Sequence, residues 1–268
     1  MIELLKIAEA DNIKNGIILY GNKSKPFIVR STDDITFNYD EFKKNVVNDN
    51  TIIYSTDKMT LEYVENIKLN ETLLDWENNM MKYNFTDSNI KSNLYDYNMI
   101  KINELTKYGV GLTMCTNNTY TPFHIDSVSR KLGGGGWVYL HEGVKQWNLI
   151  EFFDAVNNIY NSKGKHLIDI NILSQKDKLS EDISYKVYQC NMRGGDFIYF
   201  PPGWAHQVTT PEKSIGLNGY LLLDSDLQYI DKIEEWYIEN GNYSDCGLLN
   251  RPLNDNEINL HRKINNII

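Results

Sequence analysis

The residues best suited to chemistry in this sequence are two histidines and one aspartate on short apolar runs. Of the five histidines, His124 lies two residues before Asp126 in the run TPFHID at 121–126. Because side chains two apart on a strand point to the same face, we expect these two to be presented together. His206 follows the Pro-Pro-Gly-Trp break at 201–204 and begins another predicted strand. Two imidazoles and one carboxylate on one side of a metal ion leave coordination positions open, as in non-haem Fe(II) sites.

An HxD pair also occurs by chance in ordinary strands, so the motif alone leaves a structural role open. The other histidines, His141, His166 and His261, have no carboxylate at ligand spacing, and we expect them to be structural or exposed. The spacing shows neither a Ser/His/Asp set nor a reactive cysteine site.

The elements that must position these residues are short apolar strands separated by turn signals, which favour a sandwich or barrel. We predict an antiparallel barrel with strands at 109–114, 121–125, 136–140, 145–150, 185–192, 196–200, 206–210 and 215–223, and turns at 193–195 and 211–214. Before it, strands are predicted at 17–20, 27–29 and 51–54, and helices at 59–66 and 72–82. Further helices are predicted at 151–161, 227–239 and 256–267. This divides one structural unit into an N-terminal α/β elaboration at 1–106, a barrel core at 107–225 and C-terminal helices at 226–268.

Four stretches, in this order, resemble the Jumonji C (JmjC) family of Fe(II)- and 2-oxoglutarate-dependent oxygenases. They are TPFHID at 121–126, GWVYLHEGVKQWNLI at 136–150, GGDFIYFPPGWAH at 194–206 and IGLN at 215–218. The resemblance covers about 107–230. Within the family the sequence is most similar to the branch of histone lysine demethylases that carries PHD-finger or CXXC modules. It departs from that branch in a longer loop between Asp126 and Trp137 and in having no reader finger.

The resemblance implies a mainly β fold with flanking helices, a double-stranded β-helix barrel of the jelly-roll or cupin type. It implies that His124, Asp126 and His206 ligate Fe(II) and form the catalytic centre, which uses 2-oxoglutarate and dioxygen. Lys145 would bind the distal carboxylate of 2-oxoglutarate, and Thr121 would supply a hydroxyl donor. Asn218 matches a family asparagine that faces the chamber, although an asparagine before Gly219 fits a turn about equally well.

The same resemblance implies demethylation of N-methyl-lysine in histone tails, by hydroxylation of the methyl group followed by loss of formaldehyde. Two alternatives stay open. A JmjC protein or tRNA hydroxylase would leave a stable hydroxyl product, and a catalytically silent JmjC scaffold would only bind a partner.

Composition and charge narrow the class of partner and compartment. The chain of 268 residues is 41% hydrophobic and 12% aromatic, which excludes a mainly disordered protein, and it has no apolar run long enough to span a membrane. A net charge of −9 without a basic stripe disfavours direct nucleic-acid binding and favours a basic peptide or protein. Three distant cysteines and an acidic start that is no signal peptide predict a reducing nuclear or cytoplasmic compartment.

Overall fold

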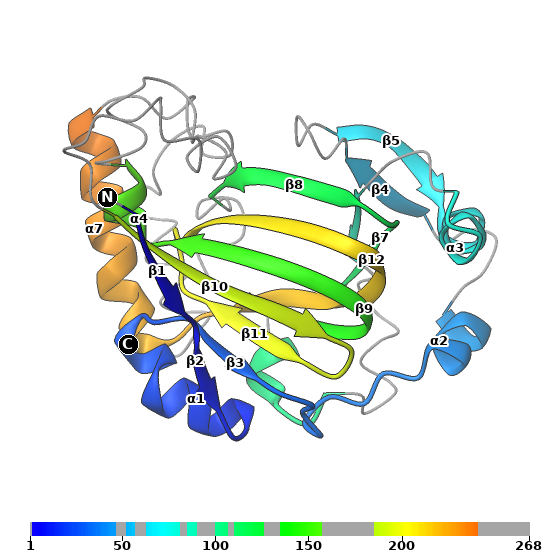
Figure 1. Cartoon of the computed structure of the whole chain (residues 1–268), viewed down its shortest axis with the longest axis horizontal. Helices are drawn as coiled ribbons and strands as arrows, with labels where there is room; N and C mark the ends of the chain where they lie inside the picture. The colour runs from blue at the N-terminus through cyan, green and yellow to red at the C-terminus, as the bar shows by residue number, and fades with distance from the viewer. Residues whose placement is uncertain are drawn as a thin grey trace.

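Two long strands form the centre of the fold, β9 (Gly135–Ile150) and β12 (Ala205–Leu221), paired antiparallel along most of their length. They are seen in a computed structural model (Figure 1) that describes residues 2–46, 52–56, 63–80, 85–89, 100–106, 110–125, 135–156 and 185–240. Each long strand has different neighbours along its two halves. The pair therefore runs through both layers of the barrel.

The first layer contains the second half of β9 and the first half of β12. On one side, β9 pairs with β10 (Tyr185–Arg193), which pairs in parallel with β1 (Ile2–Lys6). On the other side, β12 pairs with β8 (Thr119–His124). In this layer the two predicted histidine ligand positions are paired with each other at one end of the β8–β12 pair, so the layer positions the site.

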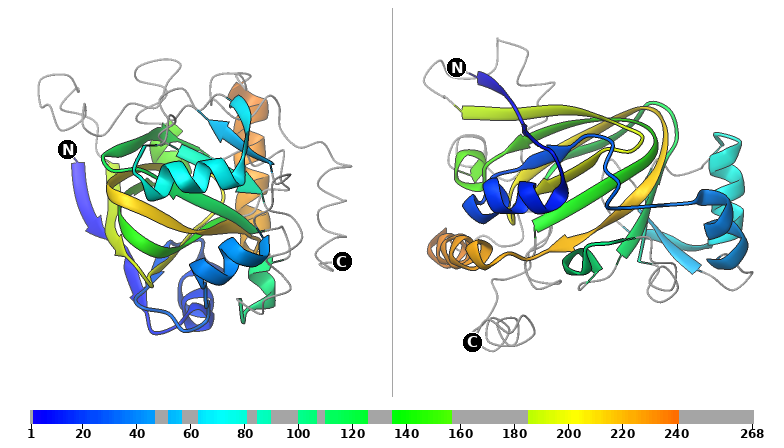
Figure 2. Two further views of the ribbon diagram at one scale, coloured as in Figure 1. Left: turned by 90° about the vertical axis from the view of Figure 1, so that its right-hand side faces the viewer. Right: turned by 90° about the horizontal axis from the view of Figure 1, so that it is seen from below.

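The second layer contains the other halves of the same two strands. Here β9 pairs with β11 (Phe197–Phe200), which continues to β3 (Phe27–Val29) and β2 (Ala8–Ala10). The partner of β12 is β7 (Val110–Cys115), followed by β6 (Phe85–Asn89), β4 (Ile52–Thr56) and β5 (Tyr63–Lys68). The left panel of Figure 2 shows the strands of both layers curving around a common interior. The predicted mainly β barrel with flanking helices is confirmed.

Alternation along the strands separates two hydrophobic cores. On β9, Val138 and Leu140 face the barrel interior, whereas Trp137 and Tyr139 face outward. The inner core consists of Ile7, Ile28, Val138, Leu140, Trp147, Leu149, Met192, Ile198, Phe200, Trp204 and Val208. The outer core is completed by α1 (Ile13–Leu19), α2 (Tyr39–Val46), α3 (Leu69–Glu77) and η3 (Asn103–Thr106).

A C-terminal helix, α7 (Asp224–Asn240), packs beside the short helix α4 (Phe152–Asp154) and near η1 (Gly21–Lys23) (Figure 1). Its first turn contains the buried carboxylate of Asp226, which accepts hydrogen bonds from the Leu223 amide at 2.9 Å and the Tyr199 hydroxyl at 3.0 Å. These bonds tie the start of the helix to β11. Within the described residues, no helix is long and apolar enough to cross a membrane.

The long strands differ from the sequence prediction, because the turn predicted at 211–214 is wrong. The β12 strand continues through it, with irregular register between Thr209 and Gly216. Strands predicted at 136–140 and 145–150 are likewise one strand, with Gly143 at φ +96° where it bends. Bulges let a paired strand bend without ending, so Pro and Gly signals here mark a corner of the barrel.

Three further predictions are wrong. In the run predicted as a strand at 17–20, residues 17–19 end α1 and Tyr20 is its C-cap. The helix forms despite its β-branched residues, and the Asn12 side chain caps its start by accepting a hydrogen bond from the Asn15 amide. Much of the helix predicted at 59–66 is instead strand β5, paired with β4. The barrel is mixed rather than antiparallel, because the β1–β10 and β2–β3 pairs are parallel. The helix predicted at 256–267 and the end of the one at 151–161 lie outside the described residues.

Candidate functional site

His206 is a buried imidazole at the start of β12, with 4% of its surface exposed. Its Nδ1 lies 3.0 Å from the backbone carbonyl oxygen of Trp204. Because a carbonyl can only accept, Nδ1 carries the proton and the lone pair of the neutral ring is on Nε2, as a metal ligand requires. The ring lies against Phe200 and Trp147, with centroid distances of 4.6 and 5.9 Å. These contacts fix the orientation of the imidazole.

The strand register places position 124 directly opposite His206. Directly paired positions of an antiparallel ladder belong to the same face of the sheet, so 124 is on the face that carries His206. The next pair in the register is Val208 with Thr121. Between the two pairs β12 advances by two residues and β8 by three, so β8 contains one extra residue. A bulge around Pro122 thus brings positions 121 and 124 to one face, which strict alternation would not do. Asp126 lies outside the described residues.

Lys145 carries an ammonium group inside the barrel. It is 4% exposed and lies on β9 opposite Met192 of the inner core. Its Nζ is 3.2 Å from the Sγ of Cys115 on β7. Across the described ranges, no carboxylate forms an ion pair with this ammonium. A buried ammonium without a counter-charge is costly, so this position suits an anionic ligand.

Asn218 lies within β12, opposite Gly111 on β7 and Val138 on β9. The turn considered for this asparagine is therefore wrong. Since Val138 belongs to the inner core, position 218 is on the inner face as well. Thr121, half-buried on β8, is the remaining predicted cosubstrate residue. The described structure thus places positions 121, 124, 145, 206 and 218 on the inner face, while their chemical roles stay predictions.

Several polar groups that sequence reasoning missed lie in the same barrel. Ser214 is fully buried opposite Cys115 in the β7–β12 pair, and its hydroxyl has no hydrogen-bond partner among the described residues. Nε1 of Trp147, whose ring contacts His206, is also buried and has no hydrogen-bond partner among the described residues. Trp76 lies on α3, and its indole N–H donates to the backbone carbonyls of Cys115 and Ser214, at 3.1 and 2.9 Å. No spacing signal could have found these residues, because only the strand register brings them together.

The residues present fit the metal and cosubstrate that the resemblance implies. The described part of the chain contains no group of three metal-ligating side chains, and the third predicted ligand, Asp126, lies beyond it. Two histidine positions nevertheless face each other across one strand pair. The buried ammonium of Lys145 and the Ser214 hydroxyl, which has no hydrogen-bond partner in the described ranges, supply the donors that a dicarboxylate would need.

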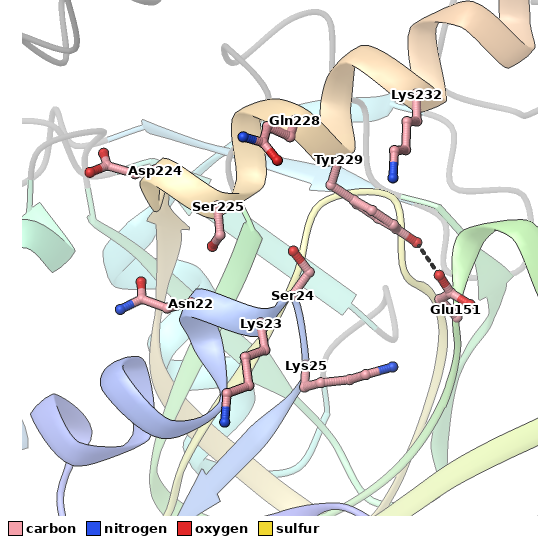
Figure 3. Close-up of a pocket in the computed structure, with 10 residues that line it drawn as sticks. All are labelled: Asn22, Lys23, Ser24, Lys25, Glu151, Asp224, Ser225, Gln228, Tyr229 and Lys232. Carbon is pink, nitrogen blue, oxygen red and sulfur yellow. Dashed lines mark hydrogen bonds between the residues drawn. The ribbon is translucent and has the colours of Figure 1, made fainter.

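A groove on the outside of the barrel, of about 530 Å³, contains none of the predicted site residues (Figure 3). It lies between η1 and the start of α7, where the Tyr229 hydroxyl donates to Glu151 at 3.0 Å. Its charged side chains are of both signs, three lysines and two carboxylates: Lys23, Lys25, Lys232, Glu151 and Asp224. This mixture indicates no particular ligand charge.

Comparison with known proteins shows what the barrel is similar to. Residues 111–219 match the family described as "JmjC domain, hydroxylase". The chain is 30% identical over 144 residues to the JmjC domain-containing histone demethylation protein 1 of Candida albicans. It is 24% identical over 112 residues to the lysine-specific demethylase phf2 of Danio rerio, and 28% identical over 110 residues to the lysine-specific demethylase 7A of Xenopus tropicalis.

These matches cover 50%, 41% and 41% of this chain, but only 28%, 9% and 11% of the three relatives. The chain therefore spans less than a third of the length of each of these relatives. The family match spans β7 to β12, which are the strands of the double-stranded β-helix predicted from the sequence. Residues 111–219 of this chain are a JmjC domain, similar to those of histone lysine demethylases.

Proposed function

We propose that this chain is an Fe(II)- and 2-oxoglutarate-dependent dioxygenase that removes methyl groups from N-methyl-lysine in histone tails. The observation that carries the oxygenase assignment is Lys145. Its ammonium is buried on the inner face of the same barrel as His206 and has no carboxylate partner in the described ranges. An anionic cosubstrate would neutralise it.

In this proposal, His124, Asp126 and His206 hold the metal, and Lys145 holds the distal carboxylate of 2-oxoglutarate with help from the Thr121 hydroxyl. Iron, 2-oxoglutarate and dioxygen together supply the oxidant that hydroxylates a C–H bond. The Trp204 carbonyl keeps the proton of His206 on Nδ1, which leaves the lone pair of Nε2 free of a proton, so that this nitrogen could hold the metal. Trp147 and Phe200 pack against that ring and exclude water from it. Asn218, on the same face, orients substrate.

The substrate class rests on charge and on the relatives. A net charge of −9 attracts basic peptides over about one Debye length. The three relatives are named for histone demethylation or lysine-specific demethylation. Hydroxylation of a lysine N-methyl carbon gives a hemiaminal that separates into formaldehyde and the demethylated amine. We accordingly expect the protein to act in the nucleus or cytoplasm.

Mass spectrometry of methylated histone-tail peptides tests the proposal. The panel is incubated with the protein, Fe(II), 2-oxoglutarate and ascorbate, with His124→Ala as the control. Loss of a methyl unit with the wild type, absent from the control, supports demethylation and identifies the lysine. If succinate accumulates while every peptide keeps its mass, the oxygenase assignment stands and the histone substrate is wrong.

A second candidate, protein hydroxylation, is favoured by the description of the matched family as a hydroxylase. Its product would gain one oxygen and keep it, which the same spectra detect. A silent JmjC scaffold would give neither product and no succinate. Absence of any succinate above the His124→Ala control would therefore refute both enzyme assignments.

A further inference from the structure

The inner face beside Lys145 contains two polar side chains with no assigned role, Cys115 and Ser214. They lie directly opposite each other in the β7–β12 pair, and both are buried. The Sγ of Cys115 is 3.2 Å from the Nζ of Lys145. The Ser214 hydroxyl has no hydrogen-bond partner among the described residues.

Their position is fixed from outside the barrel. The Trp76 indole donates to both of their carbonyls. On the neighbouring strand β9, Gly143 lies so close to Ser214 that a side-chain carbon added at Gly143 would be 2.8 Å from the Ser214 Cα and Cβ. The backbone around the hydroxyl and the thiol is therefore held from two sides. A polar group that is rigidly placed and left without a partner suits a ligand better than it suits folding.

A thiol is a weak acceptor for an ammonium, and a buried hydroxyl is stable only when it finds a partner. Both deficiencies disappear if a carboxylate enters beside Lys145. It would accept from the ammonium and from the Ser214 hydroxyl, while the thiol borders the same space.

We propose that Ser214 and Cys115 belong to the anion site of Lys145, with Ser214 donating a hydrogen bond to the distal carboxylate of 2-oxoglutarate and the Cys115 thiol forming the adjacent wall. This inference rests on the proposed function, because it assumes that the dicarboxylate binds at Lys145. It adds a specific donor and a chemically addressable thiol to that site. Neither residue is part of the ligand set predicted from the sequence.

Calorimetric titration with 2-oxoglutarate, with Mn(II) in place of Fe(II) so that no turnover occurs, tests the donor. Because a hydrogen bond to a charged group is lost, Ser214→Ala is expected to raise the Kd by about tenfold or more. Its free energy of unfolding should not fall, since the deleted hydroxyl had no partner in the described part of the chain. Thr72→Val is the matched control, a buried hydroxyl on α3 that donates to the Lys68 carbonyl at 2.9 Å. It should lower stability and leave the Kd unchanged.

Labelling with methyl methanethiosulfonate tests whether the Cys115 thiol borders the anion site. The reagent transfers its methylthio group to a thiol as a mixed disulfide and releases methanesulfinic acid, and it is small enough to follow the route of the dicarboxylate. Saturating 2-oxoglutarate should slow labelling of Cys115 at least about tenfold, while partly buried Cys190 on β10 keeps its rate. Mass spectrometry of peptides separates the two sites.

The outcomes distinguish this inference from the proposed function. If the wild type binds no 2-oxoglutarate, the proposed function fails. If the wild type binds 2-oxoglutarate and Ser214→Ala binds it equally well, the donor role of Ser214 is wrong. If the wild type binds 2-oxoglutarate but Cys115 is labelled at the same rate with and without the ligand, the thiol is not at the site.

Discussion

Asp226 should make the stability of this protein depend on pH in a way that a single substitution removes. Its carboxylate is fully buried at the first turn of α7, and burial raises its pKa from 3.8 to about 7. Hydrogen bonds from the Leu223 amide and the Tyr199 hydroxyl act in the opposite direction but do not compensate. Its second oxygen, Oδ1, has no partner among the described residues. The neutral acid is therefore the form that suits the folded state.

The direction and the size of this pH dependence follow from the linkage between proton binding and folding. Between pH 3.8 and 7 the folded state holds a proton that the unfolded state has released, so stability falls as the pH rises and becomes level above 7. A pKa difference of about three units corresponds to roughly 4 kcal/mol over this interval. Asp226→Asn keeps the shape and cannot titrate, but it buries an unpartnered N–H group at a cost of about 1–3 kcal/mol. We expect the variant to be less stable than the wild type at pH 4 and more stable at pH 8.

Urea unfolding at intervals from pH 4 to pH 8, followed by circular dichroism, measures this crossover. The quantity of interest is the difference in the free energy of unfolding between variant and wild type, which cancels groups that titrate in both. Gln228→Ala removes an exposed, uncharged side chain from the same helix; it is the control and should give a difference that does not change with pH. If the difference for Asp226→Asn is equally constant, the carboxylate is ionised in the folded protein and the argument from burial is refuted.

Two further substitutions test how the barrel holds its inner face. Trp76→Phe keeps an aromatic ring on α3 but removes the N–H shared by the carbonyls of Cys115 and Ser214, so urea unfolding should show a loss of about 1–3 kcal/mol; an unchanged midpoint would mean that these bonds contribute nothing. Gly143→Ala should lower the free energy of unfolding by more than about 1 kcal/mol, because φ is +96° and the added carbon would collide with the Lys213 carbonyl. Gly194→Ala is the control, because Gly194 is also close to a carbonyl oxygen but has no positive φ. Equal losses of unfolding free energy for the two variants would show that the positive φ of Gly143 does not contribute.

Much of the barrel could be predicted because its strands carry local signals. The runs at 27–29, 185–192 and 196–200 form strands β3, β10 and β11 close to their predicted bounds. The helix expected at 227–239 is α7. Predictions failed where pairing overrode local pattern. The Pro211 region reads as a turn in isolation, yet β12 continues through it. On one side β9 pairs with Glu212, and on the other β8 pairs up to Thr210 and β7 pairs from Ser214 onward.

The sequence by itself determined the residue types of the site and their order along the chain. An imidazole and a carboxylate two residues apart, a later histidine after a Pro-Pro-Gly break, and a lysine within an apolar strand are all properties of local spacing. They were sufficient to indicate metal chemistry and a family.

Only the tertiary structure decided which positions share the interior. Thr121 and His124 are three residues apart, and a bulge in the β8–β12 register puts them on one face. Cys115, Lys145 and Ser214 belong to three different strands, so no spacing along the chain relates them. Their proximity arises from the register in which β7 and β12 pair and from the bend of β9. Register is a long-range property set by the packing of two cores, which is why it could not be derived from local sequence.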